Sequence, residues 1–301
     1  MIVAGKGGVG KTVVSAALAR AAAMAGLDTV LVEIDGRASS HRSFDTAPLT
    51  YDERPLWRAP GGAAVHGRSL SADRALAEYL DDHGLGRLGT RLERSGALEV
   101  VATATPGLKD LLVLGKIKQL EVAARHDVVV VDAPASGHAV SFLRAPRVLL
   151  DLAGAGPIHH QAREAAAMLR DPTRAQVVLV TIPEETPVTE AIETAYALEE
   201  DVGVALAPIV VNGVYPPLRG LGRAAHAGGT GAAHAAAVLR HHRETHQRGE
   251  LLRLAAELPL EQLELPFLFT PTIGAVESRR LADAFADGVR ALPEHAVGRH
   301  D

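Results

Sequence analysis

The feature that most constrains the fold is a glycine-rich segment close to the first residue. It reads GKGGVGKT over residues 5–12, directly after the apolar run 2–4 and at the start of a helical pattern over residues 10–25. The segment satisfies the G-x-x-x-x-G-K-[ST] pattern and has the strand–loop–helix context that a phosphate loop requires. The sequence therefore predicts a nucleotide site here, and the alternative is a glycine-rich turn that binds no ligand.

Each residue type in this loop has a physical reason. Glycines let backbone N–H groups turn inward around phosphates, and the following helix N-terminus adds partial positive charge. We expect Lys11 to reach the β and γ phosphates of ATP and the Thr12 hydroxyl to bind Mg²⁺. The residues predicted to bind the nucleotide in this segment are Gly5, Lys6, Gly7, Gly8, Val9, Gly10, Lys11, Thr12 and Val13.

The rest of the chain alternates apolar, β-branched runs with helical patterns, which predicts a doubly wound, mostly parallel α/β sheet with a helical subdomain. The predicted strands are 2–4, 29–34, 98–103, 128–132, 176–182 and 208–212, and the clearest helices are 10–25 and 107–125. The apolar residues of 107–120 are expected to pack in the core, although they have the spacing of a client-binding groove. We expect residues 1–301 to form one domain.

Two stretches do not fit the alternation and are expected to form peripheral loop or helical parts near 36–95 and 218–258. Residues 36–68 are predicted to be loop-like because prolines and glycines recur there. Residues 218–232 are rich in glycine and alanine, and a long helical pattern follows from about His234 to Leu258. Five histidines lie at 226, 234, 241, 242 and 246, and we interpret them as a solvated helical face rather than a metal site.

Composition excludes several function classes. The net charge is −5, so we expect no general attraction to nucleic acid. The chain has no cysteine, which excludes disulfides, thiolate metal sites and iron–sulfur clusters. We expect no signal peptide before the glycine loop, and no run approaches the ~20 apolar residues of a membrane span. The sequence predicts a cytoplasmic protein whose membrane contact is at most indirect.

Two aspartates follow apolar strands. Asp35 ends the run 29–34, where a carboxylate can position or deprotonate a water near the γ-phosphate, with a switch or loop-capping role as the alternative. Asp132 ends the run 128–131, which is the Walker B arrangement for holding Mg²⁺ directly or through water. The predicted Mg²⁺ ligands are thus Thr12, Asp35 and Asp132.

Further motifs resemble known families. With Lys6 as a second lysine, the loop resembles the deviant Walker A of the SIMIBI class of P-loop proteins. The run DAPASGH at 132–138 resembles the switch II signature of the ArsA and tail-anchored-protein-targeting ATPases. Residues 105–112 and 115–117 look most like the actinobacterial anion-transporting ATPase branch.

The resemblance implies roles for individual residues. Lys6 would cross a dimer interface to the partner's nucleotide and act in catalysis with Asp35 and Lys11, the alternative being an exposed lysine. His138 would couple the switch, although a hydrogen-bonded structural histidine is the alternative, and Asn212 would contact the adenine edge unless it forms a strand-end turn. The switch residues implied are Asp132, Pro134, Gly137 and His138, and Pro271 belongs to the loop that would cover the base after residues 265–269.

The resemblance also implies a function: an ATP-hydrolysing dimeric switch, as a homodimer or a heterodimer with a similar ATPase, that couples its nucleotide state to a client protein or partner subunit. The absence of cysteines disfavours arsenite as a substrate and a zinc-linked dimer. Asp35 is followed by Gly-Arg-Ala at 36–38 rather than the Pro-Ala-His of the family. This departure leaves open a nucleotide-binding regulatory or assembly subunit with little turnover. A ParA-like positioning ATPase is disfavoured by the acidic charge and by the ArsA-like switch II segment, and a MinD-like one by the short polar tail.

Overall fold

A computed structural model describes residues 1–34, 39–134, 136–152 and 154–293, apart from residues 83–106. The strands are β1 (Ile2–Gly5), β2 (Thr29–Ile34), β3 (Arg54–Arg58), β4 (Ala64–Leu70), β5 (Val128–Asp132), β6 (Gln176–Thr181), β7 (Ala205–Leu206), β8 (Ile209–Val214) and β9 (Gln262–Pro266). The helices are α1 (Lys11–Met24), α2 (Ala72–Asp82), α5 (Leu108–Val122), α6 (Ser136–Leu152), α7 (Pro157–Arg170), α8 (Glu185–Ala197), α9 (Leu221–His226), α10 (Ala232–Glu257) and α11 (Ala275–Ala291), with short helical turns η1 (Ser40–Phe44) and η2 (Leu198–Val202).

A single sheet of nine strands runs through the molecule in the order β3-β4-β2-β5-β1-β6-β8-β9, and β7 pairs with β6. Within the described residues every pairing is parallel except β3 with β4. Parallel strands of this kind need both faces covered, which explains their near-continuous valine, isoleucine and leucine content. The predicted mostly parallel α/β fold is confirmed.

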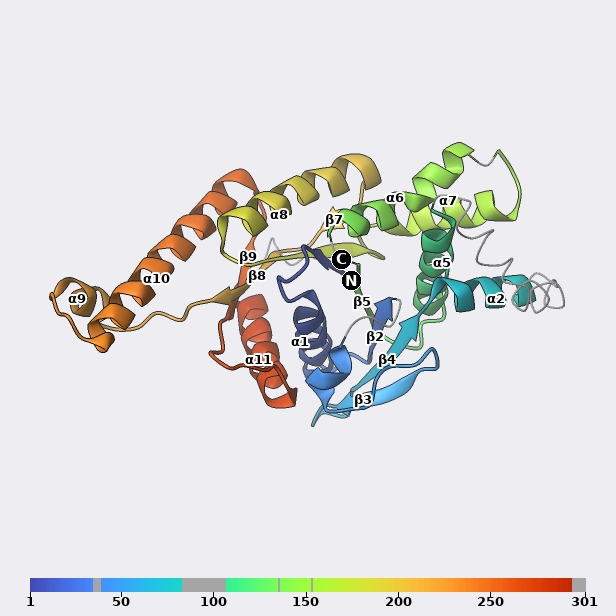
Figure 1. Cartoon of the computed structure of the whole chain (residues 1–301). Helices are drawn as coiled ribbons and strands as arrows, with labels where there is room; N and C mark the ends of the chain where they lie inside the picture. Colours follow the sequence, from blue (N-terminus) through green and yellow to red (C-terminus); the bar gives the residue numbers. More distant parts are fainter. Residues whose placement is uncertain (35–38, 83–106, 135, 153, 294–301) are drawn as a thin grey trace.

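Alternating side chains of the strands face two hydrophobic layers. Val30 and Val32 of β2 belong to the layer that α5, α6, α7 and α8 cover, whereas Leu31 faces the layer that contains α1 and α11. Figure 1 shows these two groups of helices on opposite sides of the sheet. The glycine loop therefore lies where β1, a central strand, meets α1.

The prediction that residues 36–68 are loop-like is wrong, because this stretch contains β3 and most of β4. The Pro-Gly-Gly sequence at residues 60–62 forms the turn of a hairpin, in which Ala59 N donates to Ala63 O at 2.8 Å. Pro55 is tolerated because β3 is the edge strand of the sheet, where one side of the ladder needs no donor. The prolines and glycines of this edge hairpin are the residues from which the sequence predicted a loop.

The strongly patterned elements were predicted well, and their ends moved by a few residues. The predicted strands 29–34 and 128–132 coincide with β2 and β5, while the predicted strand 98–103 lies outside the described residues. Most apolar residues of α5 are buried, including Leu111, Leu114 and Ile117 at 1%, 0% and 4% exposure, whereas Val122 at its end is exposed. They form core, as expected, rather than a client groove.

Helices α9 and α10 project from the sheet as a helical arm, at the left of Figure 1. The predicted long helix is present as α10, whose 26 residues span about 39 Å. Leu254 near its end is its one buried residue. None of the described helices has both the length and the apolar character needed to cross a bilayer.

Candidate functional site

The glycine loop occupies the carboxyl end of β1, between Gly5 and the first residue of α1, Lys11. Gly8 and Gly10 have φ values of 89° and 91°, the left-handed region that favours glycine. A side chain on Gly10 would overlap Asn212, whereas one on Gly8 would meet nothing within 4 Å. The loop is therefore packed tightly on one side and open on the other, as a cradle for phosphate oxygens requires.

Thr12 and Asp132 meet beneath the loop. Thr12 Oγ1 donates to Asp132 Oδ2 at 2.7 Å, and Ser15 Oγ donates to Asp132 Oδ1 at 3.3 Å. The first five residues of α1 supply both hydroxyls, and the end of β5 supplies the carboxylate. Hydroxyl and carboxylate oxygens are hard ligands suited to Mg²⁺, so the two predicted Mg²⁺ ligands in the described residues lie together. Ser15 was not predicted, since serine in an alanine-rich helix carries no distinct signal.

Asp132 lies in an unusual electrostatic setting. Its pKa is raised from the ordinary 3.8 to about 6 in total, because burial and, to a smaller extent, the neighbouring Glu33 outweigh the Thr12 hydrogen bond and the Lys11 charge, which lower it. Glu33 is the in-register neighbour of Asp132 on β2 and is 2% exposed. Two carboxylates thus share this buried corner, a charge arrangement that favours the arrival of a cation.

Glu33 is a second site residue, besides Ser15, that sequence reasoning missed. Its Oε1 accepts hydrogen bonds from the backbone N–H of Ser40, at 2.9 Å, and from the Ser40 hydroxyl. The contact fastens the start of η1 to the end of β2, just after the segment that contains Asp35. An acidic residue inside the apolar strand TVLVEI was the available signal, because a buried charge needs a partner.

The two loop lysines have different partners. Lys11 Nζ donates to the backbone oxygen of Lys6 at 3.2 Å. Burial lowers the pKa of Lys11, and the charge of Asp132 opposes that shift. Lys6 instead forms an ion pair with Glu190 on α8. In the single chain, therefore, the side chain of Lys6 is held by its own subunit.

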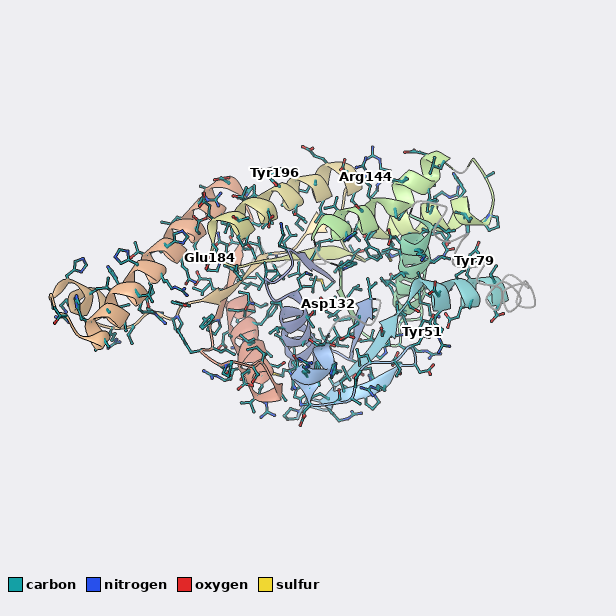
Figure 2. The ribbon with its side chains drawn as sticks, in the orientation of Figure 1. Tyr51, Tyr79, Asp132, Arg144, Glu184 and Tyr196 are labelled. Atoms are coloured by element: carbon teal, nitrogen blue, oxygen red, sulfur yellow. The ribbon has the colours of Figure 1, made fainter. Side chains whose placement is uncertain are left out.

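Asn212 lies inside β8, two residues before its end, and contacts the loop directly, because its Nδ2 donates to the backbone oxygen of Val9 at 2.9 Å. Next to it lies a cavity of about 370 Å³, and Figure 2 shows its lining residue Glu184 on the side toward α10. The residues that line it are Ile182, Pro183, Glu184, Gly213, Tyr215, Arg243, His246, Gln247 and Phe267.

Aromatic rings gather at this cavity. The rings of Tyr215, Phe267 and Phe269 lie 4.7–5.2 Å apart, and the Arg240 guanidinium lies 4.3 Å from the centre of the Tyr215 ring. Such faces can stack on a planar base. Pro271, in the exposed loop that follows, completes the segment predicted to cover the base.

The remaining predicted residues are placed only in part. Asp35 lies outside the described residues. Pro134 is half-buried just after β5, and Gly137 and His138 lie in the first turn of α6, with His138 exposed. Val13 is half-buried in the first turn of α1. The residues predicted to form the switch that the structure describes thus follow directly from the strand that carries Asp132.

Comparison with known proteins places these features in a family. Residues 1–154 match the model of the ArsA ATPase family, described as anion-transporting ATPase. ATPase BagA of Mycobacterium tuberculosis is 36% identical over 218 residues, which cover 70% of this chain and 64% of that protein. ATPase GET3B of Arabidopsis thaliana is 25% identical over 261 residues, which cover 71% and 63%. The arsenical pump-driving ATPase of Acidiphilium multivorum is 27% identical over 227 residues, which cover 70% and 39%.

Each alignment spans less than two thirds of the relative's own length. The family match covers the glycine loop, Asp35 and the 132–138 segment, the stretches on which the resemblance rested, and the mycobacterial relatives agree with the actinobacterial branch. The chain belongs to the ArsA-type anion-transporting ATPase family.

Proposed function

We propose that this chain binds ATP with Mg²⁺ and hydrolyses it, acting as a dimeric switch that couples its nucleotide state to a client protein or partner subunit. The observation that carries the proposal is the contact of Thr12 with Asp132 beneath an open glycine loop, in a chain of an ATPase family. The sheet draws its strands from Ile2 to Pro266, which supports one ATPase domain with peripheral parts near 36–95 and 218–258. A cytoplasmic location remains a prediction.

The loop residues would bind the phosphates. The open side at Gly7 and Gly8, where a side chain would meet nothing within 4 Å, leaves room for the oxygens. Lys11 is already directed along the loop and would exchange its contact with the Lys6 backbone oxygen for the β and γ phosphates. Thr12 and Asp132 would hold Mg²⁺, directly or through water, together with Asp35. The ion would neutralise charge that develops on the phosphates.

The base would bind at the aromatic cavity beside Asn212. The Nδ2 of Asn212 already donates to the loop, so its Oδ1 is the atom that remains to accept a hydrogen bond from an exocyclic amine. One residue would then fix both the phosphate loop and the base. Phe267 and the loop through Pro271 would cover the ring.

The dimer proposal concerns Lys6, which would act across the interface on the partner's nucleotide. Because Lys6 is paired with Glu190 within the chain, that ion pair must open before Lys6 can cross. Dimer closure, with an identical chain or a similar ATPase, would thereby be linked to full activity. Asp35 would orient the attacking water, and residues 132–138 would respond to the γ-phosphate.

The direct test is Mg²⁺-dependent ATP hydrolysis by the purified chain, alone and with any partner subunit, for wild type and Lys11→Ala. Arg290→Ala serves as a control because Arg290 is an exposed residue of α11 that pairs with Asp287. We expect Lys11→Ala to lose ATP binding and turnover, and the control to keep both. Absent Mg²⁺-ATPase activity together with equal ATP binding by Lys11→Ala would refute the proposal.

A regulatory subunit that binds ATP with little turnover is the second candidate. Two observations favour it: residues 36–38 depart from the family pattern, and Lys6 is held by Glu190. Turnover of wild type and Asp35→Asn, each alone and mixed with a similar partner ATPase, separates the candidates. Equal and negligible rates in every mixture would favour the regulatory subunit.

A further inference from the structure

Two histidines and a glutamate converge near the amino ends of β4 and β5, on the face of the sheet that α5 covers. Glu53 immediately precedes β3, His66 lies in β4, and His126 lies between α5 and β5. His66 is the register partner of Val30, which belongs to the α5 side of the core.

The potential ligand atoms are close together. His126 Nε2 lies 3.0 Å from Glu53 Oε1, and the rings of His66 and His126 have centroids 5.2 Å apart. One ligand atom from each of the three residues falls within 4.8 Å of the others. Ligands of a tetrahedral Zn²⁺ ion at bond lengths near 2.0–2.1 Å stand about 3.3 Å apart. Side-chain movements of about 1 Å would therefore bring the three ligand atoms to the separations that Zn²⁺ requires.

Burial gives a second, independent indication of a ligand. The His126 side chain is 6% exposed, and its Nε2 is the nitrogen that contacts Glu53. Nδ1 of His66 is buried with no hydrogen-bond partner among the described residues, so it is available as a ligand atom. A buried imidazole nitrogen without a protein partner is unfavourable unless water or an ion contacts it. No other group of three such residues in the described parts of the chain meets the same distance criterion.

We propose that Glu53, His66 and His126 form a binding site for a divalent transition-metal ion of the Zn²⁺ class. Two imidazoles and one carboxylate form a ligand set that Zn²⁺ accepts, and it leaves a fourth position open. Imidazole nitrogens select borderline ions over Mg²⁺ and Ca²⁺, which prefer oxygen. The absence of cysteine does not affect this site, because no thiolate is needed.

The fourth position would face a pocket of about 350 Å³ that Glu53 and His126 line together with Arg68, Lys116 and Arg125. Lys116 is paired with Glu78, and the Arg68 guanidinium lies 5.0 Å from the centre of the Tyr51 ring. These cations would repel a bare dication, but they stabilise an anion bound to it, such as hydroxide or chloride. The site therefore fits a metal ion that carries an anionic fourth ligand.

The ion would join three segments that are distant in the sequence: the start of β3, strand β4 and the turn between α5 and β5. It would fasten the antiparallel edge hairpin to the parallel sheet. The site is separate from the nucleotide site, because His126 lies just before the amino end of β5 and Asp132 lies at its carboxyl end, and strand β5 alone spans about 13 Å.

Titration of the full-length, metal-free protein with Co²⁺, followed by its visible absorption and by calorimetry, tests the proposal without nucleotide. We expect one Co²⁺ per chain with the intense bands of a low-coordinate site, which Zn²⁺ displaces. His66→Ala, His126→Ala and Glu53→Gln should each bind Co²⁺ at least about tenfold more weakly. His242→Ala, which removes a histidine of the α10 arm, should bind like wild type.

Glu53→Gln guards against loss of folding as an explanation, because Glu53 is exposed and the substitution keeps its size and its hydrogen-bonding capacity. Circular dichroism of the metal-free variants checks the fold. Unchanged Co²⁺ affinity in correctly folded Glu53→Gln and His66→Ala would overturn the proposal. So would loss of the bound ion in His242→Ala, which would assign binding to the histidines of the arm.

Discussion

The carboxyl and amino ends of the parallel strands carry two different kinds of site. At the carboxyl end, residues 5–12 are contiguous and form one strand–loop–helix unit. At the amino end, Glu53, His66 and His126 come from three segments, 13 and 60 positions apart in the chain. A site built on consecutive residues leaves a pattern in the sequence, whereas a site assembled across strands leaves three unremarkable residues. The following predictions separate the two ends experimentally.

The largest expected effect is at the carboxyl end. Lys11→Ala removes the cation that would stabilise charge on the transferred phosphoryl group, so we expect kcat for ATP to fall about 10²–10³-fold. Steady-state Mg²⁺-ATPase assays measure this fall. Co²⁺ binding should not change, since Lys11 lies at the other end of the sheet; a parallel loss of Co²⁺ binding would contradict the separation of the two sites.

The second effect concerns the amino end. Zn²⁺ at a hundredfold excess over its Kd should stabilise the folded chain by about 2.7 kcal/mol. Thermal unfolding with and without Zn²⁺ should therefore show a clear rise in Tm for wild type and for His242→Ala. Glu53→Gln should show a much smaller rise. An equal rise in all three proteins would indicate non-specific binding.

The third effect is the pH dependence of the Mg²⁺ requirement. Mg²⁺ needs the ionised carboxylate of Asp132, whose pKa is raised to about 6 by burial. Below pH 6 the affinity for Mg²⁺ in the presence of ATP should fall about tenfold per pH unit, beyond the fall caused by protonation of ATP itself. Measurement of the Mg²⁺ affinity from pH 5 to 8 checks this. The Asp132→Asn variant should bind Mg²⁺ more weakly and should lose the part of the pH dependence that Asp132 causes.

The same raised pKa has a consequence for the chain without Mg²⁺. The folded state holds the Asp132 proton more tightly than the unfolded chain, whose pKa is near 3.8. Its contribution to stability is therefore present below pH 4 and is lost as the pH rises to about 6. The substitution Asp132→Asn should remove this residue's part of the fall in unfolding free energy between pH 4 and pH 7. Denaturant unfolding at the two pH values measures that difference.

The smallest effect concerns Lys6. Glu190→Gln removes an ion pair whose lysine side chain is 47% exposed, and partly exposed pairs contribute about 0–1 kcal/mol. If opening of this pair limits dimer closure, turnover should rise up to about fivefold at low protein concentration, and the gain should shrink in high salt. Glu193→Gln, on the same helix, is the control. A fall in turnover would argue that Glu190 positions Lys6 productively.

The sequence predicted those parts of the candidate site that depend on short, contiguous motifs, and it missed contacts between residues that are distant in the chain. The pairing of Thr12 with Asp132 was expected because a phosphate loop and an aspartate after an apolar strand come to the same edge of a parallel sheet. Ser15 and Glu33 were missed, because their roles depend on which side chains α1 and β2 turn toward Asp132. The tie between Asn212 and Val9 was also beyond prediction, since 203 positions separate the two residues.

The fold divides in the same way. Strands β2 and β5 were located to the residue because buried parallel strands are continuous apolar runs with β-branched residues. The hairpin of β3 and β4 was missed because it forms an edge, where Pro55, charged side chains and a Pro-Gly-Gly turn are all permitted. The pattern of polar, apolar and turn residues in this stretch is compatible with a loop as well as with an edge hairpin.

By itself the sequence determined the α/β class, the phosphate loop and the family, because these depend on hydrophobic period and on short contiguous motifs. Only the tertiary structure decided that Lys6 is held by Glu190, that Glu33 lies against Asp132, and that Glu53, His66 and His126 meet. The physical reason is that such contacts depend on strand order and register. A parallel sheet places strands that are distant in the sequence next to one another, and no local sequence pattern indicates which strands will be neighbours.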